Sequence, residues 1–232
     1  MTNLKLGITQ EFDCNYLDDH KERLLVVIDD LSQQSAAYDF LMFQGFRRSG
    51  EQVYKPHCVN CNACQSLRLP VNHFKPSKSQ KRLLNRNKHF LVKTSAAEKP
   101  AYYPLFEKYI NTLHSDGTMY PATKAQFDGF IFTKVTDQLF IEVYDGEKLI
   151  SVAVTDAMPI ALSAVYTFYD PEYRTNGLGI YSILQQIEHT QNLGKEYLYL
   201  GYQIDECQKM NYKDKFYPHE RLIENRWQAI NK

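Results

Sequence analysis

Acidic side chains are missing from a long stretch of this sequence. Residues 52–97 span 46 positions without one Asp or Glu, yet they hold nine Lys or Arg. The whole chain carries 27 basic and 27 acidic residues, so the remainder must have nine net negative charges. This segregation excludes an evenly mixed surface, and it suits a protein with one face that meets a polyanion. We predict nucleic-acid contact by this segment, with a solvated basic face as the alternative.

Long apolar runs are also missing. The N-terminus has no apolar stretch of signal-peptide length, and no segment approaches the ~20 apolar residues of a membrane span. We therefore expect a cytoplasmic protein with no membrane partner. In that compartment the five cysteines do not indicate a disulfide framework. They indicate metal binding or reactivity instead.

The first half of the chain predicts short, mixed elements. The first thirty residues are acidic and irregular. Ser77 and Gln80 have the spacing of a capping box and open a basic helix to about Lys88. Ser49-Gly50 separates two short strands and indicates a hairpin. We expect helices at 32–43, 78–88, 100–114 and 124–132, and strands at 46–48, 52–54, 67–69 and 90–94.

The second half predicts strands at 138–144, 148–156, 161–169 and 197–201, with a helix from about residue 180 to Gly194. Arg174-x-x-Gly177-x-Gly179 lies between the third strand and this helix. Glycines at such a junction let backbone N–H groups approach an anion, and the helix N-terminus adds its dipole. An ordinary strand-to-helix turn is the alternative interpretation of this motif.

This loop resembles the acyl-donor loop of the Gcn5-related acetyltransferase fold, and the order of the surrounding elements is similar to that fold. We therefore predict an α/β protein with a Gcn5-related acetyltransferase-like mixed sheet and a Cys-containing N-terminal α+β module. The expected domains are 1–95, the basic Cys-containing module, and 96–232, the acyl-transfer domain.

Three of the cysteines are clustered in the sequence. Cys58-x-x-Cys61-x-x-Cys64 places three thiols within seven residues. Zinc or an iron–sulfur cluster usually takes four ligands, so Cys14 is the natural fourth and His57 a substitute. Reduced thiols that pack like small apolar residues are the alternative. Cys14, Cys58, Cys61 and Cys64 are therefore the candidate ligands of a zinc ion or an iron–sulfur cluster.

Several blocks spread over most of the chain resemble the aminoacyl-tRNA–protein transferase family. They are Gly45-Phe-Arg-Arg-Ser-Gly50, Tyr54-x-Pro56-x-Cys58-x-x-Cys61-x-x-Cys64, Ser79-Gln-Lys-Arg82, Arg86-Asn87, Tyr166-Thr-Phe-Tyr-Asp170-Pro, Leu178-Gly-x-Tyr181, Tyr199-Leu-Gly-Tyr202 and Cys207-x-Lys-Met210-x-Tyr-Lys213. The short length is similar to the bacterial, leucine-transferring branch, since the arginine-transferring relatives are generally longer.

The resemblance implies transfer of leucine from leucyl-tRNA to the α-amine of proteins that begin with Asp or Glu, which marks them for N-degron proteolysis. No cofactor is required, because the tRNA ester is already activated. The α-amine has an ordinary pKa of ~7.7–8, so a sizeable fraction is neutral and the enzyme needs mainly to position it. The oligomeric state is left open.

Candidate site residues follow from these motifs. Asp170, Tyr166 and Thr167 are the catalytic candidates, with Asp170 orienting or deprotonating the amine or, alternatively, capping the turn before Pro171. An acidic acceptor needs a cation, for which Arg47 and Arg48 are candidates together with Tyr202. The candidates for tRNA or acyl-donor binding are Lys81, Arg82, Arg86, Arg174, Gly177, Gly179, Lys209 and Lys213.

Three alternatives stay open at this point. Arginine could be the transferred amino acid. The protein could be an acetyl-CoA-dependent N-acetyltransferase, although coenzyme A needs only the local anion loop and not a long basic segment. It could also be a non-enzymatic, metal-stabilised RNA-binding module, although that interpretation leaves the Tyr-rich second half without a role.

Overall fold

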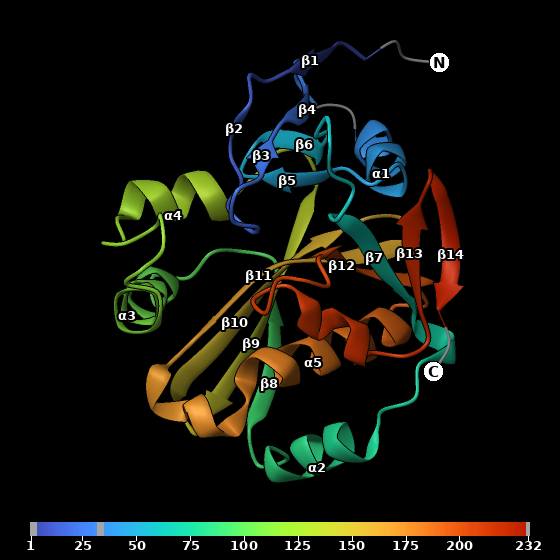
Figure 1. Cartoon of the computed structure of the whole chain (residues 1–232). Helices are drawn as coiled ribbons and strands as arrows, with labels where there is room; N and C mark the ends of the chain where they lie inside the picture. The colour runs from blue at the N-terminus through green and yellow to red at the C-terminus, as the bar shows by residue number, and fades with distance from the viewer. Residues whose placement is uncertain (1–3, 32–34, 231–232) are drawn as a thin grey trace.

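The computed structural model describes residues 4–31 and 35–230. Its centre is an eight-stranded sheet with the order β14-β13-β7-β12-β11-β10-β9-β8, drawn in Figure 1. The strands are β7 Gln65–Pro70, β8 Leu91–Ser95, β9 Asp137–Asp145, β10 Lys148–Ala157, β11 Ala161–Tyr169, β12 Tyr197–Gln203, β13 His219–Ile223 and β14 Arg226–Ile230. Neighbouring strands pair antiparallel except β11 and β12, which run parallel.

Helices cover both faces of this sheet. α3 (Tyr102–Leu113) and α4 (Lys124–Ile131) pack on one face, while α5 (Leu178–Asn192) and α2 (Lys78–Arg86) lie against the other. β11 contributes side chains to the core on each face of the sheet. Phe168 packs with the α3 and α4 side chains, and Leu162 packs with those of α5. Each fully buried side chain of this size stabilises the fold by ~1.5–3 kcal/mol.

A smaller sheet lies at one end of the molecule, at the top of Figure 1. Its strands are β1 Leu6–Ile8, β4 Leu24–Val27, β6 Gln52–Pro56 and β5 Arg47–Ser49, in the order β1-β4-β6-β5. The hairpin β2 (Phe12–Asp13) and β3 (Lys21–Glu22) and helix α1 (Ser35–Phe43) accompany it. Tyr38, Met42 and Val53 of this part share a core with Ala161 and Tyr199 of the large sheet. The small sheet is therefore packed against the large one.

Many of the predicted elements are confirmed. The capping box forms as expected, with Ser77 Oγ accepting from the Gln80 amide and Gln80 Oε1 accepting from the Ser77 amide. The hairpin at Ser49-Gly50 is present as β5 and β6. The α/β class and the Gcn5-related acetyltransferase-like order of β9, β10, β11, turn, α5 and β12 are confirmed as well. Short 3-10 helices, η1 (Val71–His73), η2 (Pro171–Asn176) and η3 (Asn211–Lys215), connect the main elements.

The structure also departs from the predictions. The first thirty residues are not irregular, because they contain β1 to β4, which are two to four residues long and too short to show an alternating pattern. The first predicted helix begins at Ser35, and its expected start at 32–34 lies outside the described residues. The hairpin β13–β14 had no sequence signal that we recognised. The large sheet also takes β7 and β8 from the first 95 residues, so it crosses the expected boundary at 95.

Candidate active site

The site is organised by two parallel strands that separate. β11 and β12 pair only over Ala161–Ser163 and Tyr197–Tyr199. Each strand has a bulge where they part, at Val165 in β11 and at Leu200 in β12. Gly201 follows the second bulge with φ +83°, a backbone conformation that favours glycine. A bulge residue is left out of the ladder, so its backbone groups are available to a ligand.

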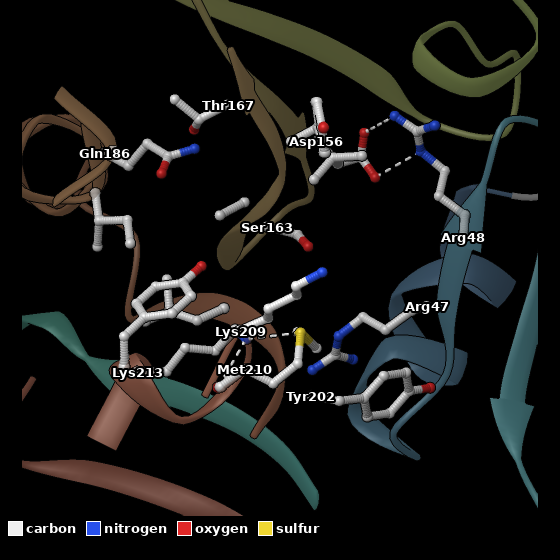
Figure 2. A pocket seen from close by; sticks show the side chains of 18 of the residues that line it. Arg47, Arg48, Asp156, Ser163, Thr167, Gln186, Tyr202, Lys209, Met210 and Lys213 are labelled. Carbon is white, nitrogen blue, oxygen red and sulfur yellow. Dashed lines mark hydrogen bonds and ion pairs between the residues drawn. The ribbon is translucent and has the colours of Figure 1, made fainter. Parts of the chain in front are cut away.

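The gap between the separated strands opens into a cavity of about 670 Å³. Val165 and Leu200 lie in its wall. Side chains from α5, from α3 and α4, from the small sheet and from the segment around η3 complete it, and Figure 2 shows a part of the lining. The cavity is large enough to hold a ligand of small-molecule size. The residues that line it come from parts of the chain that are far apart in sequence.

The α5 wall of the cavity carries the two predicted glycines. Gly177 adopts φ +62° and precedes the first residue of α5. A Cβ at Gly177 would come 3.2 Å from Leu83 of α2, whereas a Cβ at Gly179 would meet nothing within 4 Å. The first glycine thus allows α2 to approach, and the second leaves space for a ligand beside the start of the helix.

At the opposite side of the cavity lies Arg47, on β5. Its side chain is 6% exposed, and it sits over the rings of Tyr199 and Tyr202, 5.1 and 5.6 Å from the centroids. Nη1 donates to the Phe46 carbonyl, but Nε and Nη2 have no hydrogen-bond partner in the described part of the chain. An unsatisfied buried guanidinium is costly unless a ligand completes it.

The next residue, Arg48, has a different environment. Its Nε and Nη2 donate to the two carboxylate oxygens of Asp156 at 2.8 and 2.6 Å, and Tyr38 donates to the same carboxylate at 2.8 Å. Burial raises the pKa of Tyr38 well above its usual value, so the hydroxyl stays protonated. Arg48 and Asp156 line the cavity but neutralise each other. Of the two predicted acceptor-binding arginines, Arg47 alone retains free hydrogen-bonding capacity.

Three of the other predicted residues also line the cavity near Arg47. Tyr202 donates to the Gly45 carbonyl at 2.9 Å, which holds its ring in place under the guanidinium. Lys213 is 4% exposed, and burial lowers its pKa to about 8. Lys209 is exposed and forms an ion pair with Asp116 at 3.1 Å. The structure thus brings Arg47, Tyr202 and the segment from Lys209 to Lys213 together at one cavity.

An aromatic wall faces the other side of the cavity. It is formed by Tyr109, His114, Phe130, Tyr166 and Tyr169. Burial raises the pKa of Tyr109 and of Tyr166, and it lowers the pKa of His114, so all three side chains are uncharged near neutral pH. Tyr166 and Thr167 were predicted for the site and both line it. Tyr109, His114, Phe130 and Tyr169 were not predicted as site residues, and the high tyrosine content of the chain was the only signal for the two tyrosines.

Asp170 does not line the cavity. Its carboxylate accepts from Lys108 and Lys148 at 2.8 and 2.9 Å and from the Glu172 amide at 3.1 Å. Although its burial alone would raise the pKa of Asp170, the hydrogen bonds from the two lysines outweigh it and hold the pKa below its usual value. A carboxylate this well satisfied is a weak base. This geometry agrees with the alternative interpretation of Asp170, in which its side chain caps the turn at Pro171.

The acid-free segment forms an exposed basic surface. Seven of its nine basic side chains are exposed: Lys75, Lys78, Lys81, Arg82, Arg86, Lys88 and Lys93. No carboxylate of the described residues forms an ion pair with any of them. Arg86 donates to the Thr175 carbonyl and Asn87 to the Asn176 carbonyl, both at 2.9 Å. The basic helix is thereby fastened to the turn that leads into Gly177. Arg174 lies in this turn, exposed and outside the cavity lining.

The cysteines lie outside the cavity lining. Burial, with Cys58 and Glu22 as the next contributors, raises the pKa of Cys64 to about 12, which favours the protonated thiol. Cys14, Cys58, Cys61 and Cys64 are all unbonded and half-buried. Within residues 4–31 and 35–230, no three Cys, His, Asp or Glu side chains are grouped so that they could hold a metal ion. The zinc or iron–sulfur site is not confirmed.

Comparison with known proteins decides the family. The model of the arginine-tRNA-protein transferase N terminus matches residues 12–82, and that of the C terminus matches residues 101–223. A protein of Pseudoalteromonas atlantica, named aspartate/glutamate leucyltransferase, is 52% identical over 99% of both chains. The chain belongs to this family. A second leucyltransferase of the same name, from Aeromonas hydrophila, is 45% identical over 98% of this chain and 96% of its own.

Family membership settles the class of the protein. It is an enzyme, an aminoacyltransferase related to the aspartate/glutamate leucyltransferases. The two alternatives of an acetyl-CoA-dependent acetyltransferase and a non-enzymatic RNA-binding module are not supported. Within the described residues, no helix has the length and apolar character needed to span a membrane.

Proposed function

We propose that this aminoacyltransferase moves leucine from leucyl-tRNA to the α-amino group of proteins whose first residue is Asp or Glu. The observation that carries the proposal is Arg47, a buried cation at the cavity wall with two nitrogens that lack partners among the described residues. A carboxylate can accept from Nε and Nη2 as a bidentate pair. An Asp or Glu side chain at the acceptor N-terminus supplies that group.

The acceptor end of the cavity is assigned to the side formed by the small sheet. Arg47 stacks on Tyr202, and Tyr54 and Tyr16 line the same region. Tyrosines pre-shape the site without adding charge, since burial raises the pKa of Tyr202 and of Tyr16 above the usual value. A neutral Asn or Ala at the acceptor N-terminus would leave the Arg47 cation unpaired, which costs several kcal/mol.

The donor end is assigned to the side formed by α5, α3 and α4. Gly179 leaves space beside the helix N-terminus, as a phosphate or ribose needs. Tyr109, Tyr169 and His114 offer rings on which the terminal adenine can stack. α2, fastened to the turn before Gly177, presents its cations to the acceptor arm of the tRNA.

The chemical step needs orientation more than strong acid–base catalysis. The neutral α-amine attacks the ester carbonyl, the ester C–O bond breaks, and the proton lost by the amine passes to the departing ribose oxygen. Backbone N–H groups at the Val165 and Leu200 bulges can stabilise the oxyanion. The hydroxyls of Tyr166 and Thr167 line the cavity and can relay the proton. Asp170 acts indirectly, by shaping the turn into the donor loop.

Two finer assignments are proposed with this function. The reaction takes place in the cytoplasm, where charged tRNA is found. Cys14 and Cys64 lie close to Tyr16, and Cys64 also lies close to Tyr54, so a metal ion bound to these thiols would act on the acceptor side of the cavity. The transfer step itself uses no metal in this proposal.

Leucyl transfer can be tested directly. The protein is incubated with leucyl-tRNA or arginyl-tRNA and with peptides that begin with Asp, Glu, Asn or Ala. We expect leucine on the α-amine of the Asp and Glu peptides, without added coenzyme A, and at least a hundredfold less product with Asn and Ala. Arginine transfer at the rate of leucine transfer would contradict the proposed donor, and equal use of the Asn peptide would contradict the acceptor.

The basic surface on α2 should bind the tRNA. We expect the triple variant Lys81→Ala, Arg82→Ala, Arg86→Ala to bind leucyl-tRNA more weakly and to lower the slope of log K against log salt by about one unit for each phosphate that is no longer neutralised. Lys5, Lys134 and Arg226, which are exposed and lie outside α2, give a matched triple Ala control with an unchanged slope. Filter binding over a series of salt concentrations measures both; a triple α2 variant with the parental slope would rule out this surface.

A further inference from the structure

Two buried cations in the described part of the chain have no counter-ion, and both face the same cavity. Among the described residues, four Lys or Arg side chains are buried: Arg47, Arg48, Arg68 and Lys213. Arg48 is paired with Asp156, and Arg68 with Glu220 at 2.6 Å. Arg47 and Lys213 have no carboxylate within ion-pair distance in residues 4–31 and 35–230. The described fold therefore pairs two of these four buried cations and leaves the other two, both in the cavity wall, without a counter-ion.

Lys213 is held in place by groups that carry no charge. It lies on η3, and its Nζ is 3.2 Å from the Met210 carbonyl oxygen and 3.7 Å from the Met210 sulfur. The ammonium group also lies 4.7 Å from the centre of the Tyr212 ring. The Lys213 ammonium has three N–H donors, and these contacts do not use all of them. It can therefore still donate a hydrogen bond to a ligand. In Figure 2 Met210 is drawn between Lys213 and Arg47.

Electrostatics link the two cations. Burial lowers the pKa of Lys213 to about 8, Cys207 opposes this, and the nearby charge of Arg47 lowers the pKa further. The other titratable groups at this end of the cavity are Tyr16, Tyr54, Tyr202, Tyr212 and Lys209. Burial is the main cause of a raised pKa for each of the four tyrosines, which therefore provide no negative charge at neutral pH. An anion placed between the two cations would relieve their repulsion.

We propose that Lys213 and Arg47 together form a two-cation receptor for the side-chain carboxylate of the acceptor's first residue. This inference rests on the proposed function and assigns Lys213 to the acceptor rather than to the tRNA. Two cations make the distinction between a carboxylate and an amide larger than one cation can, because Asn would leave both unpaired.

The two side chains contribute differently. The Arg47 guanidinium is fixed by the Phe46 carbonyl and by the Tyr199 and Tyr202 rings. Lys213 carries its charge on a flexible four-carbon stem. The rigidly held guanidinium and the more flexible ammonium can together bind the carboxylate of Asp. They can also bind that of Glu, which lies one methylene further from the reacting amine. This accounts for one site that accepts both residues.

The receptor predicts that acceptor binding is coupled to a proton. A bound carboxylate favours the charged form of Lys213 and so raises its pKa. Above the pKa of the empty enzyme, about pH 8, binding must therefore draw a proton onto Lys213, and acceptor affinity falls as the pH rises. An arginine at this position stays charged and removes this dependence.

The test measures acceptor binding without the reacting amine. A peptide capped with a succinyl group has the carboxylate of an N-terminal Asp but no α-amine to titrate. Its Kd is measured by calorimetry from neutral to alkaline pH, on both sides of the Lys213 pKa, for the parent, Lys213→Met and Lys213→Arg, with Lys215→Met as the control. Lys215 lies on the same 3-10 helix but is exposed. An acetyl-capped peptide gives the baseline without a carboxylate.

We expect Lys213→Met to weaken binding of the succinyl peptide by roughly 10- to 100-fold at neutral pH. Lys213→Arg should stay within about threefold of the parent and lose the decline at alkaline pH, because its charge does not titrate. Lys215→Met should match the parent. Parental affinity in a folded Lys213→Met protein would overturn the receptor.

The outcome is separable from the proposed function. A protein that binds the succinyl peptide through Lys213 but transfers no leucine would refute the donor assignment and leave the receptor in place. A protein that transfers leucine to Asp peptides, with KM and kcat unchanged in Lys213→Met, would refute the receptor and leave the function in place.

Discussion

Replacing Arg47 by Met should lower leucyl transfer to Asp and Glu peptides by a hundredfold or more. The substitution keeps an apolar side chain of comparable length over the Tyr199 and Tyr202 rings but removes both unpartnered nitrogens. Losing one partner of a desolvated charge pair costs about 2–5 kcal/mol. The loss should appear mainly in KM for the acceptor, since the tRNA ester is held elsewhere. Steady-state kinetics at saturating leucyl-tRNA measure it.

Arg226, exposed on β14, provides the control. Arg226→Met should transfer leucine at the parental rate. Arg47→Lys should recover part of the activity, because an ammonium restores the charge but not the bidentate geometry. An Arg47→Met enzyme with parental KM for the Asp peptide would show that the acceptor carboxylate binds elsewhere.

Replacing Arg48 by Met should lower the free energy of unfolding by about 3–5 kcal/mol. This change leaves the Asp156 carboxylate buried with Tyr38 as its remaining hydrogen-bond donor among the described side chains. For a chain of this length the loss corresponds to a fall in Tm of roughly 10 °C. Calorimetry or the near-ultraviolet circular dichroism signal of the buried tyrosines can follow the transition.

The neighbouring Arg47→Met variant is the matched control for stability. Arg47 has no carboxylate partner in the described residues, so its removal should leave Tm unchanged or raise it. The double variant Arg48→Met, Asp156→Leu should recover much of the stability that the single variant loses, since it leaves no unpaired charge. Equal destabilisation by Arg47→Met and Arg48→Met would contradict the different roles assigned to these adjacent residues.

The sequence by itself determined features that depend on residues close together in the chain. The Ser77–Gln80 capping box, the hairpin at Ser49-Gly50 and the glycines that open α5 are local, because their hydrogen bonds and backbone angles involve a few neighbouring residues. The charge segregation of residues 52–97 also needed no structure, since net charge follows from composition. The family motifs identified the transferase because they combine many such local signals.

Only the tertiary structure decided where these side chains lie and which partners they have. Arg47 and Arg48 are adjacent and chemically identical in the sequence, yet one meets Asp156, 108 residues away, and the other faces a cavity. The sequence indicated Asp170 as a catalytic residue, but in the fold its carboxylate forms ion pairs with Lys108 and Lys148. β7 likewise joined the large sheet through pairing with β12 and β13. Ion pairing, burial and strand order join distant parts of the chain, and no local pattern records such contacts.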